Sequence, residues 1–339
     1  MRKTVVLVLL KPEDEDSQPF RDVIANDTVL RDQIDLRFAD SDGAHAHIGE
    51  ADVAVGGNLA PELLAKADRL RWIAFWSAGM DGKFMPELQA RNLLLTNASG
   101  VHGPNIAEHV MMFMLMFTRN EPFYFRNQLG HVWKRDNWGQ EKWNRRPHRS
   151  GASELTGQTL GIVGLGRIGE ALAVRAKAFD MRVIATKRDP GSRHNAHVEL
   201  DAVYSQEELP RLLAESDHVC VTVPYTPDTH HLIDATMLAH MKPTAYLYNI
   251  GRGATIEEAA LVDALKNDRL AGAGLDVFET EPLPDDSPLW TMEKVIFTPH
   301  VSGITPFYFH RMALLLADNL HRFLTDQPLQ NLFDPSRGY

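Results

Sequence analysis

The feature that most constrains the fold of this chain is the glycine-rich loop GLGRIG at residues 164–169. Its first, third and sixth residues are Gly164, Gly166 and Gly169. The apolar run TLGIV precedes the loop, and an apolar stripe at helical spacing follows it, made of Ile168, Leu172, Ala176 and Phe179. Glycines at this spacing between a strand and a helix permit a tight turn and a close approach to a pyrophosphate. The loop therefore predicts a dinucleotide-binding unit in which Arg167 and Ile168 also contact the cofactor.

The residues at the end of the next apolar run bear on which dinucleotide binds. An acidic residue about 20 positions beyond such a loop accepts hydrogen bonds from the adenosine ribose of NAD. Here the segment reads Thr186, Lys187, Arg188, and Lys187 stands eighteen residues after Gly169. The two cations would attract the 2′-phosphate of NADP, and the threonine hydroxyl can donate to it. We predict NADP, with two alternatives open: the cations face only solvent, or Asp189 binds the ribose of NAD.

The remaining sequence alternates short apolar runs with helix-compatible stretches, which is typical of parallel α/β proteins. Before residue 100 the runs are TVVLVLL, ADVAVGG, RWIAFW and LLLTNAS; after residue 155 they are TLGIV, MRVIATK, HVCVTVP, AYLYNIG, AGAGLDV and KVIFTPH. Because 339 residues exceed the usual size of one domain, roughly 100–200 residues, we expect two domains.

Several helix signals accompany these runs. A helix is predicted to begin near Pro104 and to include the apolar run Val110 to Phe117, buried on most sides. A C-terminal helix is predicted from the stripe Met312, Leu316, Leu320 and Phe323. The S/TxxE spacing predicts two capping boxes, Ser205 with Glu208 and Thr255 with Glu258.

Composition and charge disfavour several function classes. The net charge of −10 argues against sequence-independent binding of nucleic acid. A single cysteine, Cys220, excludes disulfides within the chain and a cysteine-rich metal site. The pairs His45/His47 and His230/His231 have no third ligand at a suitable spacing, so we predict no metal. The longest apolar run is far shorter than the roughly 20 residues that span a bilayer, and no signal-peptide cleavage site is evident, so we expect a cytoplasmic, non-membrane protein.

Three later runs each end in a chemically capable residue. NIGRG contains Arg252, LDVFETEPLP contains Glu281, and TPH ends in His300. Ligands bind at the carboxyl ends of strands in open α/β sheets. Reduction of a ketone by hydride needs a proton donor, a group that adjusts that donor and a cation for the substrate's carboxylate. Taken singly, each residue also has a purely structural interpretation, but together, after a dinucleotide loop, they predict a catalytic set.

Six motifs in order, SAGMDG, GLGRIG, VPYTPDTHHLI, NIGRG, GLDVFETEPLP and TPHVSG, resemble those of the D-isomer-specific 2-hydroxyacid dehydrogenase family. The resemblance implies His300 as the acid/base, Glu281 as its partner, which favours the protonated ring, and Arg252 as the ligand of the substrate carboxylate and carbonyl. It places the other side of that carboxylate on the backbone of Ala78 and Gly79. It also assigns the nicotinamide half of the cofactor site to Val223, Pro224, Thr229, Ile250, Gly251 and Asp276.

The resemblance further implies two Rossmann-like domains. One is a flavodoxin-like substrate domain (1–103 and 302–339), and the other is an inserted doubly wound dinucleotide-binding domain (104–301), with the substrate in the cleft between them. A homodimer is the family expectation. The predicted helix that contains Val110 to Phe117, here called the Met-rich helix, supports this expectation. An excursion from Glu121 to Gly157 supports it too, since this segment contains Trp133, Trp138, Trp143 and the basic stretch NRRPHRS.

Among substrates, a small 2-keto acid such as glyoxylate or hydroxypyruvate fits best. VGGNLAPE offers no cation for a phosphorylated substrate, and formate dehydrogenases have Gln where this chain has Glu281. Two alternatives stay open. One is a phosphite-type dehydrogenase, and the other is a dinucleotide-sensing module like the corepressor branch, with Trp133 to Arg149 as the partner surface.

Overall fold

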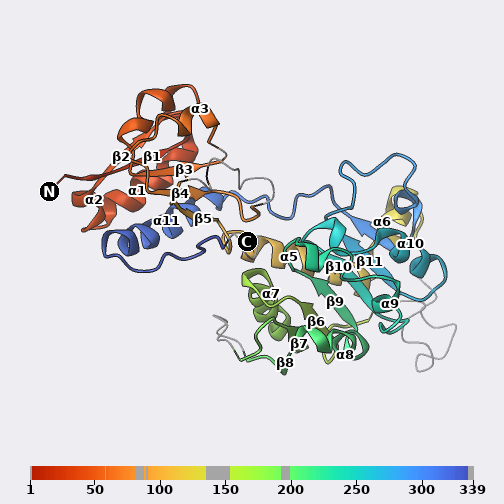
Figure 1. The fold of residues 1–339 in the computed structure, drawn as a ribbon. Coiled ribbons are helices and arrows are strands. Elements are labelled where there is room, and N and C mark those ends of the chain that lie inside the picture. Colours follow the sequence, from red (N-terminus) through yellow and green to blue (C-terminus); the bar gives the residue numbers. More distant parts are fainter. Residues whose placement is uncertain are drawn as a thin grey trace. The chain divides into compact units, whose positions relative to one another are not determined.

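The computed structural model describes residues 2–57, 59–80, 88, 91–134, 153–191 and 199–334. The chain divides into two compact units, Met1–His102 with Ile304–Tyr339, and Gly103–Gly303. Figure 1 shows the elements of each unit. No helix in the described ranges is both long and apolar enough to span a membrane. The sequence predicts that one domain binds the substrate and the other binds the dinucleotide, and this assignment stays a prediction.

The first unit is built on a five-stranded parallel sheet with the order β2-β1-β3-β4-β5. The strands are β1 (Thr4–Val8), β2 (Ile34–Phe38), β3 (Val53–Gly56), β4 (Trp72–Phe75) and β5 (Leu94–Thr96). The helical elements are η1 (Glu15–Ser17), α1 (Gln18–Asn26), α2 (Leu30–Gln33), η2 (Gly43–Ala46), η3 (Ile48–Glu50), α3 (Pro61–Leu64) and α11 (Tyr308–Leu324). This strand order is that of flavodoxin-like sheets, so the predicted fold class of this unit is confirmed.

Both faces of this sheet are buried, which explains its continuous apolar strands. In β1, Val6 and Val8 pack with α1 and α11 on one face, whereas Leu7 packs on the other face. The predicted stripe of the C-terminal helix is buried throughout, and α11 runs beside α1 in Figure 1. His45 lies in the short 3₁₀ turn η2, and His47 directly follows it.

The second unit is built on a seven-stranded parallel sheet with the order β12-β11-β10-β9-β6-β7-β8. The strands are β6 (Thr159–Val163), β7 (Arg182–Thr186), β8 (Ala202–Tyr204), β9 (His218–Val221), β10 (Tyr246–Asn249), β11 (Gly272–Leu275) and β12 (Val295–Phe297). Counted from β6, the order is 3-2-1-4-5-6 with a seventh strand at the edge, the order of doubly wound dinucleotide-binding sheets. The predicted fold class is confirmed here as well.

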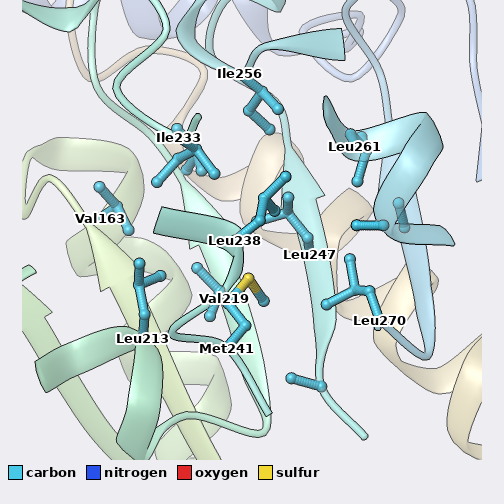
Figure 2. Close-up of a cluster of buried hydrophobic side chains, with 14 of the residues drawn as sticks. Val163, Leu213, Val219, Ile233, Leu238, Met241, Leu247, Ile256, Leu261 and Leu270 are labelled. Carbon is cyan, nitrogen blue, oxygen red and sulfur yellow. The ribbon is translucent and has the colours of Figure 1, made fainter. Parts of the chain in front are cut away.

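Helices cover both faces of this second sheet. The helical elements are α5 (Gly103–Thr118), α6 (Glu121–Leu129), α7 (Arg167–Ala178), η4 (Gln206–Glu208), α8 (Leu209–Glu215), η5 (Pro227–Thr229), α9 (Ala235–Leu238), η6 (Gly253–Thr255), α10 (Glu258–Lys266) and η7 (Pro288–Thr291). One apolar cluster joins α5 and α7 to one face, and another joins α8, α9 and α10 to the opposite face. Figure 2 shows the second cluster, where Leu213, Leu238 and Leu261 gather around Val219 and Leu247 of the sheet.

Of the helix signals predicted from the sequence, one capping box is present and the other is not. The capping box of Ser205 and Glu208 is present at η4. The box predicted for Thr255 and Glu258 is wrong, because α10 begins at Glu258 and its N-cap is Glu257. Thr255 is the last residue of η6, and its hydroxyl donates to the carbonyl of Arg252 over 2.6 Å. Phe179 follows the end of α7 and is 40% exposed, so it does not complete the predicted buried stripe.

The excursion that begins at Glu121 shows no clear helix or strand period in its sequence, but its first nine residues form α6. Trp133, just beyond, is 97% exposed. Trp138 and Trp143 lie outside the described residues, and so do Arg146 and Arg149 of the basic stretch. The Met-rich helix is buried over only part of its surface, because Met112 is 39% exposed.

Candidate active site

The glycine loop lies where the strand order of the second sheet reverses. It follows β6, which pairs with β7 on one side and β9 on the other. The Gly164 N–H donates to Thr186 Oγ1 at the end of β7 over 3.1 Å, and the Gly164 carbonyl accepts from Thr222 Oγ1 beyond β9 over 2.5 Å. Gly164 has a φ of +95°, which disfavours any side chain. The loop is thus anchored to both neighbouring strands at a ligand-binding position of this fold.

The three glycines meet three different requirements. A Cβ at Gly164 would lie 2.5 Å from Cγ1 of Val223, and a Cβ at Gly169 would lie 2.9 Å from Cγ2 of Ile162 in β6. A Cβ at Gly166 would meet no atom within 4 Å. Gly166 is the extended N-cap of α7, at the end of the helix whose backbone N–H groups can bind an anion. A tight turn, an open approach and close helix–strand packing are the three features that a pyrophosphate site needs, and the loop fits that group.

The predicted ribose site follows β7. Lys187 is half-buried, and its backbone N–H donates to the carbonyl of Tyr204 over 2.9 Å. Arg188 is exposed. Thr186 was expected to donate to the 2′-phosphate, but it is only 4% exposed and its hydroxyl accepts the Gly164 N–H. The structure therefore gives Thr186 a part in fixing the glycine turn that the sequence did not indicate.

The segments predicted for the nicotinamide half pack on one another beyond β9 and β10. Val223 and Thr229 are buried, while Pro224 is exposed. Thr229 Oγ1 donates to the carbonyl of Pro224 over 2.8 Å and closes the 223–229 turn. Ile250 and Gly251 are buried too, and a Cβ at Gly251 would lie 2.8 Å from the carbonyl oxygen of Val223. The ends of these adjacent strands are therefore in close contact.

The backbone at Arg252 is held by residues that sequence reasoning missed. Asn249, the last residue of β10, is 1% exposed. Its Nδ2 donates to the Arg252 carbonyl over 3.0 Å, and its Oδ1 accepts the Gly251 N–H over 3.1 Å. Thr255 donates to the same carbonyl, and Arg252 Nη1 donates to the carbonyl of Gly251 over 2.9 Å. A buried amide at the end of an apolar strand, directly before Ile-Gly-Arg, is the signal that could have identified Asn249.

His300 and Glu281 form a hydrogen-bonded pair beyond β11 and β12. His300 Nδ1 lies 2.7 Å from Glu281 Oε2, and Glu281 Oε1 accepts the N–H of Phe278 over 3.0 Å. Because a carboxylate only accepts, Nδ1 must hold the hydrogen of this bond. Nε2 is then the ring nitrogen that Glu281 does not engage. The pair has the arrangement of an acid/base imidazole oriented by a carboxylate.

Asp276, predicted near the nicotinamide carboxamide, is fully buried directly after β11. Its carboxylate accepts from the Thr298 hydroxyl over 2.5 Å and from the N–H groups of Val301 and Ser302, each over 2.9 Å. Its backbone carbonyl accepts the N–H of His300, also over 2.9 Å. Asp276 therefore holds the segment on which His300 adopts a φ of +53°.

Ala78 and Gly79, the predicted carboxylate ligands, follow β4 of the first unit and are half-buried. Ser77 Oγ donates to the carbonyl of Gly79 over 2.9 Å. This turn is at the carboxyl end of its own sheet, where ligands bind in such folds.

Within the described part of the chain, no group of three or more His, Cys, Asp or Glu side chains is arranged to hold a metal ion. The rings of His230 and His231 stack 3.9 Å apart, and His231 Nε2 lies 2.7 Å from a carboxylate oxygen of Glu279. His231 thus has a carboxylate partner.

The chain is similar in sequence to known proteins. The family model described as "D-isomer specific 2-hydroxyacid dehydrogenase, NAD binding domain" matches residues 111–302. Glyoxylate/hydroxypyruvate reductase B of Pectobacterium carotovorum subsp. carotovorum (strain PC1) is 37% identical over 287 residues, which cover 84% of this chain and 86% of the relative.

Two solved structures resemble the whole chain. One is a D-isomer specific 2-hydroxyacid dehydrogenase family protein from Aeromonas salmonicida subsp. salmonicida A449, with a TM-score of 0.75, 33% identity, and coverage of 98% of this chain and 99% of that one. The other is an NADPH-dependent glyoxylate/hydroxypyruvate reductase from Sinorhizobium meliloti in complex with NADP and sulfate. It has a TM-score of 0.75 and 26% identity, and the match covers 99% of this chain and 100% of that one.

Proposed function

The chain belongs to the D-isomer specific 2-hydroxyacid dehydrogenase family, and we propose that it reduces small 2-keto acids of the glyoxylate or hydroxypyruvate type with NADPH. The family makes it an oxidoreductase that acts on the CH–OH group of 2-hydroxy acids. The finer assignment rests on the reductase names of its relatives and on the residues at the strand ends of the second unit.

The observation that supports the proposal most is the His300–Glu281 pair, 2.7 Å apart. A dihydronicotinamide, when bound, supplies the hydride to the carbonyl carbon. The carbonyl oxygen then gains negative charge and needs a proton, which His300 Nε2 would donate. Glu281, bonded to Nδ1, would fix the orientation of the ring. In the oxidation direction the same nitrogen would accept the proton of the hydroxyl.

Arg252 would hold the carboxylate of the keto acid. A guanidinium binds a carboxylate bidentately, so it fixes both the position and the plane of the substrate. The backbone of Ala78 and Gly79 is proposed as a further ligand of that carboxylate, as the family resemblance implies. A substrate that is held in this way loses less entropy when its carbonyl is aligned with the hydride donor.

The preference for NADP rests on charge. Lys187 and Arg188 follow β7, and the 2′-phosphate is the feature that distinguishes NADP from NAD. The double variant Lys187→Asp/Arg188→Ala is expected to raise the Kd of NADPH at least about tenfold and to leave that of NADH nearly unchanged. The matched control is Lys266→Asp, since this lysine is the last residue of α10 and precedes β11, whereas the proposed cofactor site lies after the strands. An unchanged ratio of the two Kd values would refute the assignment.

The experiment that tests the function compares oxidation of NADPH and NADH with glyoxylate, hydroxypyruvate, pyruvate and phenylpyruvate at neutral pH. Turnover of a small keto acid is expected, faster with NADPH. His300→Asn is expected to lower kcat by roughly 10²- to 10⁴-fold while leaving the Kd of NADPH unchanged. Absence of turnover with every keto acid would refute the proposal, and oxidation of phosphite or cofactor-dependent binding of a partner protein would then identify which alternative holds.

A homodimer is part of the proposal. Between α5 and α7 lies a largely apolar groove of about 620 Å³, lined by Met111, Met112, Leu115, Met116 and Phe179. Charged groups of both signs border it, including the Glu108–Arg175 pair at 2.7 Å, so the same patch on a second copy can complement it. Light scattering is expected to give twice the monomer mass of 38.1 kDa, and a monomer at micromolar concentration would refute this part.

A further inference from the structure

One face of α5 contacts the segment that contains His300. Asn105, His109 and Phe113 are four residues apart and therefore lie along the same side of the helix. Asn105 Nδ2 donates to the carbonyl of Ser302 over 2.7 Å. His109 Nε2 lies 2.9 Å from Thr298 Oγ1, and its ring packs edge-on against Phe113 at a centroid distance of 4.8 Å. The two polar residues thus hold both ends of residues 298–302.

The hydrogen bonds along this face have a defined direction. Thr298 has one hydroxyl hydrogen, and it is directed to the Asp276 carboxylate, which only accepts. The Thr298 oxygen must therefore accept from His109, so His109 Nε2 holds a hydrogen. Burial lowers the pKa of His109, with a smaller opposing effect from the Asp276 carboxylate, so the neutral ring is favoured. The chain of donors runs from His109 through Thr298 to Asp276.

This chain ends on the group that fixes the backbone at His300. The Asp276 carboxylate accepts the N–H groups of Val301 and Ser302, and its carbonyl accepts that of His300. His300 has a φ of +53°, a conformation that a side chain adopts only where neighbouring contacts impose it. If the Asp276 carboxylate rotates, the N–H groups of Val301 and Ser302 lose their acceptors, and the backbone that follows His300 is no longer held in the position that directs its imidazole.

We propose that His109 is a positioning residue for the reaction: by donating to Thr298 it fixes the Asp276 carboxylate and, through it, the orientation of His300. This inference rests on the proposed function, in which His300 is the acid/base. It assigns His109 no contact with substrate or cofactor. The role requires a hydrogen-bond donor at the position of Nε2 and does not require an imidazole ring.

The test compares His109→Leu, which removes the donor, with His109→Gln, which returns an N–H near the ε position. His109→Leu is expected to lower kcat at least about tenfold, because small displacements of a catalytic group are costly, with unchanged Kd for NADPH. His109→Gln is expected to recover most of the lost rate. The matched control is Glu108→Gln, one residue away on α5, whose carboxylate pairs with Arg175 instead. Equal rates in His109→Leu and wild type, or no recovery in His109→Gln, would overturn the proposal.

A second readout does not depend on activity. Hydrogen–deuterium exchange of the peptide that contains residues 298–303 is expected to quicken in His109→Leu and to stay near the wild-type rate in His109→Gln. Unchanged exchange in His109→Leu would overturn the proposal even if the rate fell. If His109→Leu does not fold, Thr298→Val removes the same link from its other end at equal size. If the wild-type protein reduces no keto acid, only the proposed function is refuted. Hydrogen–deuterium exchange still tests whether His109 holds residues 298–303 through Thr298 and Asp276.

Discussion

Alanine at Gly166 and at Gly164 should have opposite consequences, although the two glycines are two residues apart. A Cβ at Gly166 meets no atom within 4 Å, and the residue is the extended N-cap of α7. Loss of a glycine cap costs stability, whereas a less flexible unfolded chain restores about 0.4–1 kcal/mol. We therefore expect Gly166→Ala to change the free energy of unfolding by no more than about 1 kcal/mol.

Cofactor binding should respond strongly to the same change. An amide of the loop can bind a phosphate oxygen only at about 2.9 Å, whereas a methyl group keeps other atoms at about 3.5 Å or more. The pyrophosphate must then move away from Gly166 and lose a charge-assisted hydrogen bond, which contributes about 1.5–3 kcal/mol. This loss corresponds to a Kd for NADPH that is raised roughly 10- to 150-fold.

Gly164→Ala should instead destabilise the fold. The φ of +95° costs a side chain about 1–2 kcal/mol, and the new Cβ would lie 2.5 Å from Val223 Cγ1, which adds about 1–3 kcal/mol of overpacking. The sum is a loss of roughly 2–5 kcal/mol. Gly157→Ala is the matched control, because Gly157 has a φ of +74° but no atom within 4 Å of its Cβ position. It should show the strain alone and unchanged binding.

Urea denaturation of the cofactor-free protein and fluorescence titration with NADPH would measure both quantities for the three variants. The reasoning is refuted if folded Gly166→Ala binds NADPH within twofold of the wild type, because the open side of Gly166 would then not face the pyrophosphate. Equal stabilities of Gly164→Ala and Gly157→Ala would show that contact with Val223 costs nothing.

Three further predictions concern groups of the second unit that are half-buried (Asp217) or buried (Cys220 and Tyr248). Burial raises the pKa of Asp217, but hydrogen bonds from Lys242 and from a strand amide outweigh it and hold that pKa below its ordinary value of about 3.9. Its stabilisation is thus complete above that value and lost as pH falls further; Asp217→Asn should cost about 1.5–3 kcal/mol at pH 7 and flatten the acid side of a urea-denaturation pH profile, whereas an unchanged acid side would contradict the assignment. Burial raises the pKa of the Cys220 thiol, so it should react with a thiol reagent only in urea, and full labelling of the native protein within minutes would disprove its burial. Tyr248→Phe should cost about 1–3 kcal/mol, because the buried Tyr248 hydroxyl lies 2.9 Å from Nδ1 of the buried His218; an unchanged urea midpoint would show that this contact contributes nothing.

Much of the fold could be predicted because parallel strands that are buried on both faces read as continuous apolar runs. All ten predicted runs contain strands, from Thr4–Val8 to Val295–Phe297. The two strands that were missed are β2, which alternates apolar and charged residues, and β8, which has three residues. Both lie at sheet edges, where one side of the strand has no partner strand and less apolar sequence is required.

Helix signals were less reliable because they are short and local. The four-residue pattern of Thr255 and Glu258 matched a capping box, yet α10 begins only at Glu258, and Thr255 belongs to η6. A cap can also form without the expected pattern: Thr226 and Thr229 form a reciprocal cap that lacks the usual acidic residue. A local pattern therefore predicts a cap only where the helix begins at the residue that the pattern implies.

The residues of the candidate site also differ in how well the sequence predicted them, and for a similar reason. Residues expected to meet a ligand could be selected from sequence because their chemistry and their place after a strand are both visible there, as for Arg252 and His300. The positioning contacts of Thr186 and His109 could not be predicted, because each spans a long separation in the chain: 22 residues between Thr186 and Gly164, and 189 between His109 and Thr298. Such contacts arise only when parallel strand ends and α5 are assembled, and no local pattern encodes them. The orientation of His300 is therefore a property of the assembled second unit rather than of the motif that contains it. For this reason, substitution of His109, to which no contact with substrate or cofactor is assigned, should still change the rate, whereas substitution of its neighbour Glu108 should not.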